Sequence, residues 1–203
     1  MRIAVIGAGS VGTSLASGFA RAGHDVFLGT RDTGASHVTS LSRQYGDSLR
    51  VRDYRTAAQA AEIVVLTVPG RVVVETVTRI GTDAFAGSIV IDVTNPVLVT
   101  EKGVTSAFGE DDSAAEALQR ALPGAHVVKA FNQIEAANML RRLPDEKRPL
   151  RIAGNDEPSK AVVAELLESF GWKVRDLGPL SRARPLERGV VDWVARQHQE
   201  GDV

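Results

Sequence analysis

A glycine-rich segment near the N-terminus carries the clearest chemical signal in the sequence. Residues 7–12 read Gly-Ala-Gly-Ser-Val-Gly, directly after a short apolar run and directly before a run with helical periodicity. In such a loop Gly7 permits the tight turn, Gly9 lets the backbone approach a pyrophosphate, and Gly12 lets helix and strand pack closely. The N–H groups at the start of the helix attract phosphate oxygens. The segment therefore predicts a dinucleotide-binding loop.

The end of the second predicted strand indicates which dinucleotide is bound. A site for NAD usually has Asp or Glu there, which accepts hydrogen bonds from the ribose hydroxyls, whereas this chain reads Gly29-Thr30-Arg31. The Thr30 hydroxyl and the Arg31 guanidinium suit the 2′-phosphate of NADP. Asp32 follows and is the residue that could reach a ribose instead. We therefore predict NADP(H), with a merely solvated Arg31 as the alternative.

Three further segments are expected at the same edge of the sheet. Ligands of open α/β sheets bind beyond the carboxyl ends of the strands, and three predicted strands end in residues 67–70, 92–96 and 129–132. The first segment, with Val68 and Pro69, is expected to cover the dinucleotide with apolar and backbone surface. The other two are expected toward its nicotinamide end.

Asn95, Lys129 and Asn132 are the candidate catalytic residues at that end. Lys129 with Asn132 could supply a proton donor to a carbonyl substrate. A structural role is the alternative for each, because Asn95-Pro96 is an ordinary turn dipeptide and polar groups at strand ends are often satisfied locally. Hydride transfer between two bound ring systems needs no such donor, since the protein mainly holds the rings together.

Apolar runs and helical periodicity alternate along the chain. The predicted strands are residues 2–7, 26–28, 49–52, 63–68, 88–93, 126–131, 150–153 and 173–176. The predicted helices are residues 11–22, 36–45, 56–61, 72–80, 114–122, 134–143, 159–170 and a final helix. Residues 94–112 are predicted as a long exposed loop. The alternation predicts an α/β fold, a Rossmann-type doubly wound, mostly parallel sheet with helices on both faces.

No repeat, low-complexity linker or shift in composition divides the chain. One NADP-binding Rossmann domain is therefore expected over residues 1–203, with a dinucleotide-binding core at about 1–145 and a small C-terminal αβ extension at about 146–203. An apolar stripe at helical spacing runs along the final helix and comprises Leu186, Val190, Trp193 and Val194. The stripe is expected to pack on the protein's own sheet, with a homodimer contact as the alternative.

Composition excludes several classes of protein. The 24 basic and 25 acidic residues give a formal charge of −1, which argues against nucleic acid or an anionic membrane as the main partner. The absence of cysteine excludes disulfides, thiolate catalysis and cysteine-ligated metals. None of the four histidines, His37 among them, is spaced as a metal ligand, and each is expected in an ordinary structural or surface role. A cytoplasmic protein with no membrane span and no metal is expected.

Several segments together resemble one protein family. They are the glycine loop, Gly29-Thr30-Arg31, Val65-Leu66-Thr67-Val68-Pro69, and residues 153–157, 159–163 and 176–187. Over nearly its whole length the chain resembles the NADPH-dependent deazaflavin-coenzyme reductases, which are 8-hydroxy-5-deazaflavin:NADP oxidoreductases. The resemblance implies a Rossmann domain with a small C-terminal extension and no large substrate domain. It implies NADP(H) contacts at Gly7, Gly9, Ser10, Val11, Gly12, Thr30, Arg31, Val68 and Pro69.

The resemblance also implies an activity. It is that of an NADP(H)-dependent oxidoreductase, which transfers a hydride between NADPH and a deazaflavin- or flavin-like acceptor, with the deazaflavin coenzyme F420 as second substrate. Members with this activity look to have a histidine at the position of Asn132 and apolar residues around Asp92–Pro96, so this chain departs from them at the acceptor end. Two alternatives stay open: an NADP-dependent dehydrogenase or reductase of a small carbonyl substrate, and a non-catalytic NADP-binding sensor. The resemblance also favours a homodimer.

Overall fold

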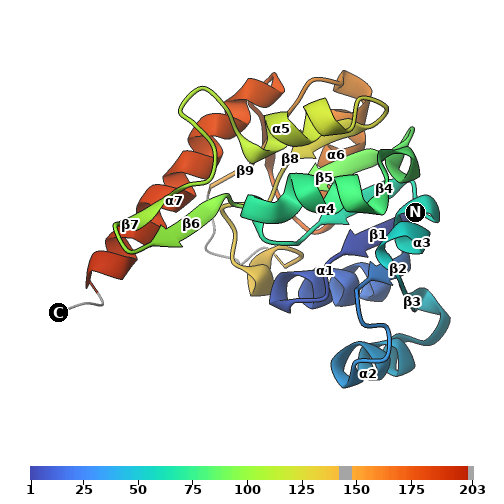
Figure 1. The fold of residues 1–203 in the computed structure, drawn as a ribbon. Coiled ribbons are helices and arrows are strands. Elements are labelled where there is room, and N and C mark those ends of the chain that lie inside the picture. The colour runs from blue at the N-terminus through green and yellow to red at the C-terminus, as the bar shows by residue number, and fades with distance from the viewer. Residues whose placement is uncertain (142–147, 201–203) are drawn as a thin grey trace.

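The computed structural model describes residues 1–141 and 148–200 (Figure 1). Over these ranges, eight strands form one sheet: β1 (Arg2–Ile6), β2 (Asp25–Gly29), β3 (Leu49–Arg52), β4 (Ile63–Leu66), β5 (Ile89–Asp92), β8 (His126–Lys129), β9 (Leu150–Gly154) and β10 (Val174–Asp176). A separate hairpin consists of β6 (Val97–Thr100) and β7 (Gly103–Ser106). The helices are α1 (Ser10–Arg21), α2 (Ser36–Tyr45), α3 (Tyr54–Gln59), α4 (Val73–Ile80), α5 (Ala114–Ala121), α6 (Glu157–Ser169) and α7 (Ala183–Glu200).

The strand order of the sheet is β10-β9-β8-β5-β4-β1-β2-β3. The pairs are parallel apart from β8 with β9, which run antiparallel with Lys129 opposite Ala153. The order reverses on either side of β1, as in doubly wound folds, where the ligand crevice lies at this reversal. The predicted α/β fold of Rossmann type is confirmed.

Alternate residues of the central strands build two hydrophobic cores, one on each face of the sheet. Ile3 and Val5 of β1 belong to the core that includes α1, α2 and α6, whereas Ala4 and Ile6 belong to the core that includes α3, α4 and α5. Period-two alternation of buried side chains is what a strand with both faces covered requires. Figure 1 shows α1 and α2 on one side of the sheet, with α4 and α5 on the other.

The expected loop over residues 94–112 contains the hairpin β6–β7, so that prediction is wrong in part. Val97 pairs with Ser106 and Thr100 with Gly103, around a two-residue turn. Gly103 has φ 112°, a conformation that favours glycine. The β-branched residues of Val97–Thr100 form the first strand, which is too short to stand out as an alternating pattern.

The helix expected over residues 134–143 is also wrong. The described residues contain only a short 3₁₀ turn at Ala136–Asn138, and Leu143 lies outside the described ranges. The carbonyl of Ala136 accepts a hydrogen bond from Ser14 of α1, and that of Met139 accepts one from the Trp172 indole at 2.7 Å. These contacts with α1 and with the segment between α6 and β10 replace the carbonyl partners that a helix would supply.

The final helix packs on the hairpin rather than on the large sheet. Helix α7 contacts chiefly β7 and β6, and Figure 1 shows it alongside the hairpin at the edge of the molecule. Of the predicted apolar stripe, Leu186 is buried, but Trp193 has 56% of its surface exposed. The prediction that the whole stripe packs on the sheet is therefore wrong for its C-terminal part.

Candidate functional site

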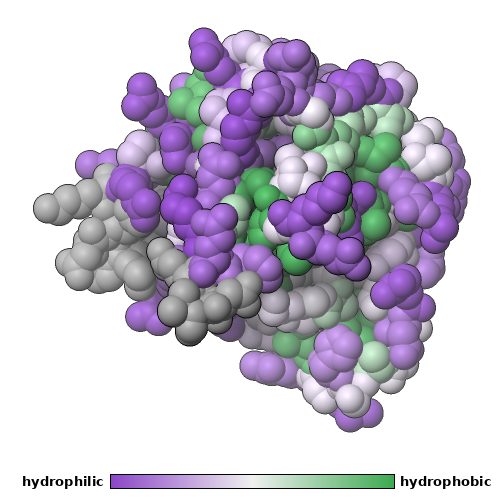
Figure 2. Space-filling view, turned by 60° about the vertical axis from the view of Figure 1, so that its left-hand side comes forward, coloured by the Kyte–Doolittle hydropathy of each residue, from purple (hydrophilic) through white to green (hydrophobic). Residues whose placement is uncertain are grey.

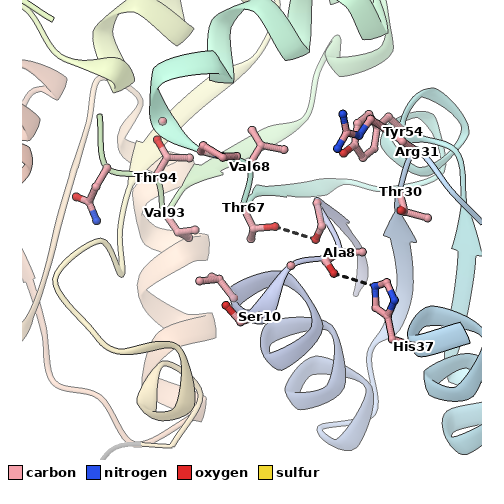
Figure 3. A pocket seen from close by; sticks show the side chains of 16 residues that line it. Ala8, Ser10, Thr30, Arg31, His37, Tyr54, Thr67, Val68, Val93 and Thr94 are labelled. Carbon is pink, nitrogen blue, oxygen red and sulfur yellow. Dashed lines mark hydrogen bonds between the residues drawn. The ribbon is translucent and has the colours of Figure 1, made fainter. Parts of the chain in front are cut away.

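A cavity of about 560 Å³ lies at the carboxyl ends of β1, β2, β4 and β5 (Figure 3). Its lining includes Gly7, Gly9, Ser10, Val11, Thr30, Arg31, Val68, Pro69 and Asn95 from among the residues predicted for the site. The lining also includes Ala8, His37, Tyr54, Thr67, Gly70, Val93 and Thr94. Gly12, Lys129 and Asn132, which were predicted as well, lie outside the lining.

The three glycines of the loop have different surroundings. A Cβ on Gly12 would lie 1.8 Å from the carbonyl oxygen of Gly7, and Gly7 itself has φ 116°. A Cβ on Gly9 would meet no atom within 4 Å. Gly7 and Gly12 are therefore required by the packing of the loop, whereas the space at Gly9 is open to a ligand.

Thr67 fastens the end of β4 to the glycine loop. Its hydroxyl lies 2.9 Å from the carbonyl oxygen of Ile6 and 3.0 Å from that of Gly7, and the second contact is drawn in Figure 3. A Cβ on Gly7 would approach this hydroxyl to 2.8 Å. Thr67 thus holds the first turn of the loop against the neighbouring strand.

The end of β2 presents a buried hydroxyl and an exposed cation. Thr30 is buried, and its hydroxyl accepts a hydrogen bond from the Asp32 N–H at 3.3 Å. The Arg31 side chain is exposed and has no ion pair within the described part of the chain. The Asp32 carboxylate accepts a hydrogen bond from the Gly34 N–H at 2.9 Å, so it caps its own loop. The cation at this end of the pocket is therefore not neutralised by a partner.

His37 is a pocket residue that the sequence did not reveal. Its ring Nε2 lies 3.2 Å from the carbonyl oxygen of Ala8, as Figure 3 shows. It lies in the first turn of α2, and only the fold brings this turn next to the glycine loop. No motif or spacing in the sequence marks this position.

A second cavity, of about 730 Å³, adjoins the first beside Arg31. The two share Thr30, Arg31, Tyr54, Val68 and Pro69 in their linings. The second cavity adds side chains from the start of α3 and from α4, including Arg55 and Ile80, and Val72 just before α4. An aromatic ring and aliphatic side chains beside an arginine suit a flat heterocycle.

Lys129 belongs to a buried ionic cluster behind the pocket. Its ammonium lies 2.9 Å from Asp92 Oδ2, 2.8 Å from Glu187 Oε1 and 2.5 Å from the carbonyl oxygen of Thr94. Glu187 of α7 also accepts hydrogen bonds from the N–H groups of Ala114 and Ala115, at the start of α5. The cluster therefore joins β5, β8, α5 and α7.

The charges of the cluster shift two pKa values. Burial lowers the pKa of Lys129, but the attraction of Asp92 and Glu187 outweighs it, so that the pKa is raised. Burial raises the pKa of Glu187 above that of an ordinary carboxyl, against the attraction of Lys129. Lys129 has no exposed surface, and its three acceptors match the three donors of an ammonium group. Through its hydrogen bond to the carbonyl oxygen of Thr94, Lys129 positions the Thr94 backbone.

Asn95 and Asn132 pair with each other between the ends of β5 and β8. Asn132 Nδ2 lies 3.0 Å from Asn95 Oδ1 and 3.0 Å from the carbonyl oxygen of Leu186 in α7. Asn95 Nδ2 donates to the carbonyl oxygen of Asn132 at 2.8 Å. Phe131 immediately before has φ 62°, which costs about 1–3 kcal/mol and persists only where the surroundings enforce it. Asn95 lines the pocket, whereas Asn132 lies outside the lining and holds Asn95 in place through their two hydrogen bonds.

Thr94 combines a fixed backbone with an unpaired hydroxyl. Its N–H donates to Asp92 Oδ1 at 2.9 Å, and its carbonyl accepts from Lys129. Among the described residues, its Oγ1 is the buried side-chain nitrogen or oxygen that has no hydrogen-bond partner. A buried hydroxyl without a partner loses its interaction with water and gains nothing in return.

Replacement of this hydroxyl by a methyl group is expected to stabilise the protein. Thr94→Val keeps the shape and removes the unpaired group, so the free energy of unfolding should rise by about 1 kcal/mol. Urea unfolding without cofactor measures the change. Thr78→Val is the matched control, because Thr78 is exposed on α4 and its hydroxyl donates within its own helix. A loss of stability in Thr94→Val would show that the hydroxyl has a partner.

Neither a metal site nor a membrane span emerges from the described residues. They contain no group of three or more His, Cys, Asp or Glu side chains that could hold a metal ion. In the acidic run at residues 110–112, Asp112 pairs with Arg120. No helix in the described ranges is long and apolar enough to cross a bilayer.

One comparison with known proteins matches the N-terminal half of the chain, and two others cover nearly the whole chain. A family model described as NADP oxidoreductase, coenzyme F420-dependent, matches residues 2–96. The chain is 33% identical over 199 residues to the F420-dependent NADP reductase of Methanothermobacter thermautotrophicus, a match covering 93% of this chain and 85% of that protein. A crystal structure of a candidate F420-dependent NADP reductase from Arthrobacter sp. FB24 superposes with a TM-score of 0.90 at 31% identity, covering 99% and 95% of the two chains.

A second group of relatives is larger than this chain. The metalloreductase STEAP3 of Rattus norvegicus is 28% identical over 186 residues, which are 92% of this chain and 36% of that protein. The similarity thus covers about a third of the length of the metalloreductase.

Proposed function

Because the chain belongs to the coenzyme F420-dependent NADP oxidoreductase family, we propose that it transfers a hydride between NADPH and a deazaflavin acceptor, coenzyme F420. The observation that carries this proposal is the pocket that runs from Arg31, past the open space at Gly9, to Asn95. It lies at the carboxyl ends of four adjacent strands, β2, β1, β4 and β5. Three strand spacings of about 4.8 Å give the pocket a span of roughly 14 Å along the edge of the sheet.

Each part of NADP(H) has a proposed place in this pocket. The pyrophosphate lies on the backbone of the glycine loop, and the adenine lies in the adjoining cavity beside Arg31. Thr30 and Arg31 face the 2′-phosphate. The nicotinamide lies toward Val68 and Asn95. The proposed contacts are Gly7, Gly9, Ser10, Val11, Gly12, Thr30, Arg31, Val68 and Pro69.

The protein's contribution to the reaction is to bind and to orient. The nicotinamide supplies the hydride when NADPH is bound. The chain's own groups hold the ring at the end of β5, where Lys129 and Asp92 fix the backbone of Thr94 and Asn132 fixes the side chain of Asn95. Lys129 and Asn132 are therefore proposed as positioning residues. Asn95 is the candidate that can touch a ligand.

Two other functions are weighed against this one. A dehydrogenase or reductase of a small carbonyl substrate needs a proton donor in the pocket, and the buried, fully engaged ammonium of Lys129 is unsuited to that task. A non-catalytic NADP-binding sensor would use the same pocket without turnover, because a fold does not determine a function.

An anaerobic absorbance assay tests the proposal. Purified protein is mixed with NADPH and oxidised F420, with flavin mononucleotide and flavin adenine dinucleotide as parallel acceptors. A loss of F420 absorbance at a rate that depends on protein concentration is expected. Reduction of a flavin alone would contradict the deazaflavin acceptor, and NADPH binding without oxidation would support the sensor. Gly9→Ala, which should bind NADPH about a hundredfold more weakly, controls for reduction that does not depend on the proposed site.

A homodimer is proposed from the surface around α7. Large exposed hydrophobic residues include Trp193 on α7 and Val99 on β6, which has 60% of its surface exposed. Helix α7 packs on strand β6, so both residues lie on the same part of the molecule. Figure 2, which brings this side forward, shows hydrophobic areas framed by hydrophilic side chains. Light scattering that gives a monomer mass at high micromolar concentration would contradict the dimer.

Two broader expectations are also proposed. The whole chain, residues 1–203, is proposed to act as one NADP-binding domain, because β9 of the extension pairs with β8 of the core. A cytoplasmic location is proposed. Small molecules rather than nucleic acid or membrane are proposed as partners, because the net charge is −1. Limited proteolysis that releases a stable fragment ending near residue 145 would contradict the single domain. Recovery in the membrane fraction would contradict the location.

A further inference from the structure

His37 lies between the glycine loop and the end of β2. It belongs to the first turn of α2, its side chain is exposed, and it lines the same pocket as Thr30 and Arg31. Figure 3 shows its ring beside Ala8 and below Thr30, on the opposite side of the loop from Ser10. The ring is therefore on the side of the pocket where β2 ends, away from the start of α1.

The contact with Ala8 determines which ring nitrogen is free. A carbonyl oxygen only accepts hydrogen bonds, so the Nε2 at 3.2 Å from Ala8 must carry a proton. The other nitrogen, Nδ1, has no partner among the described residues. In the protonated ring, Nδ1 also becomes a donor, and a charged N–H is a strong partner for a phosphate oxygen.

The end of β2 is where Rossmann proteins read the adenosine ribose. An acidic residue there binds the 2′-hydroxyl of NAD, and a basic group accommodates the 2′-phosphate of NADP. At this end the chain presents the unpaired guanidinium of Arg31, and the Asp32 carboxylate is turned to its own loop at Gly34. With both ring nitrogens protonated, His37 adds a second group that can donate to a phosphate at the same place.

We infer that His37 is a second contact for the 2′-phosphate of NADP(H), beside Arg31, and that it contributes to the preference for the phosphorylated dinucleotide. The inference rests on the proposed function, because it takes the pocket as an NADP(H) site. The ring is anchored through Nε2 to the glycine loop and meets the phosphate through Nδ1.

The variant His37→Gln separates the contact of Nε2 with Ala8 from the proposed contact of Nδ1 with the phosphate. The amide nitrogen of Gln can take the place of Nε2 and donate to Ala8, but Gln has no counterpart of Nδ1. Isothermal titration of NADPH and NADH into wild type and variant gives four dissociation constants. The Kd for NADPH is expected to rise about three- to tenfold and the Kd for NADH to stay unchanged. His198→Gln on α7, outside the pocket lining, is the matched control and should leave all four values unchanged.

Other outcomes would overturn the inference in distinguishable ways. An equal loss for both nucleotides would mean that His37 only supports the glycine loop. No change for either nucleotide would mean that the ring does not meet the ligand. Arg31→Ala provides the scale, because it should lower NADPH affinity more than His37→Gln does. If the wild type bound neither nucleotide, the proposed function would itself fail, and the inference with it.

Discussion

Gly9→Ala is expected to leave the fold intact and to weaken NADPH binding by about a hundredfold or more. The new methyl group meets no protein atom within 4 Å, so nothing in the folded chain opposes it. Gly9 is the N-cap of α1 with φ −77°, which alanine adopts without strain. The methyl group points into the space proposed for the pyrophosphate. Loss of two charge-assisted hydrogen bonds, at about 1.5–3 kcal/mol each, accounts for the expected change in Kd.

Gly12→Ala should instead destabilise the fold and is the control. Its Cβ would lie 1.8 Å from the Gly7 carbonyl oxygen and 2.7 Å from Thr67 Oγ1, so the loop must move. We expect a loss of about 3 kcal/mol in the free energy of unfolding. Urea unfolding and NADPH titration on the two variants separate the roles. A Gly9→Ala variant that binds NADPH like the wild type would place the pyrophosphate elsewhere.

The parts of the site that could be predicted from the sequence are local. The glycine loop is six consecutive residues between a strand and a helix, and Thr30-Arg31 follows the next strand directly. In both cases the chemistry depends on backbone that is continuous with the motif. The structure confirms that these segments line one pocket, whereas their contacts with NADP(H) remain predictions.

The parts that could not be predicted depend on which strands become neighbours. Asp92 and Lys129 are 37 residues apart, and they meet because β5 and β8 are adjacent in the sheet. Glu187 reaches them from a helix that packs on a hairpin, and the hairpin itself was not predicted. In the sequence, nothing distinguishes His37 from an ordinary residue on the surface of a helix. Identification of each of these contacts needed the strand order or the helix packing, which no local pattern encodes.

Lys129→Met is expected to destabilise the protein by about 3–5 kcal/mol. Methionine fills a similar volume, but it leaves Asp92 and Glu187 buried next to each other without a counter-charge. Both carboxylates are almost completely buried, so water cannot take over the role of the ammonium. The carbonyl of Thr94 also loses its donor. Urea unfolding at neutral pH measures the loss.

The loss should depend on pH in a defined direction. Burial raises the pKa of Glu187, and the attraction of Lys129 opposes this rise. Without Lys129 the pKa of Glu187 rises further above its value in the unfolded chain. A carboxyl whose pKa is raised by folding favours the folded state at low pH, and this contribution is lost as the pH rises through the folded-state pKa. The deficit of Lys129→Met should therefore be larger at pH 8 than at pH 5.

Glu187→Gln distinguishes charge from packing as the cause. This variant removes one buried negative charge and leaves the Lys129–Asp92 pair, so its loss should be smaller, about 1–2 kcal/mol. Because both variants keep the side-chain volume, a difference between them reflects charge and hydrogen bonding rather than packing. A Lys129→Met deficit that is independent of pH and equal to that of Glu187→Gln would contradict the ionic account. The stability deficit of Lys129→Met should be smaller at pH 5. NADPH binding of this variant at pH 5 therefore measures how far the cluster positions Thr94 and Asn95.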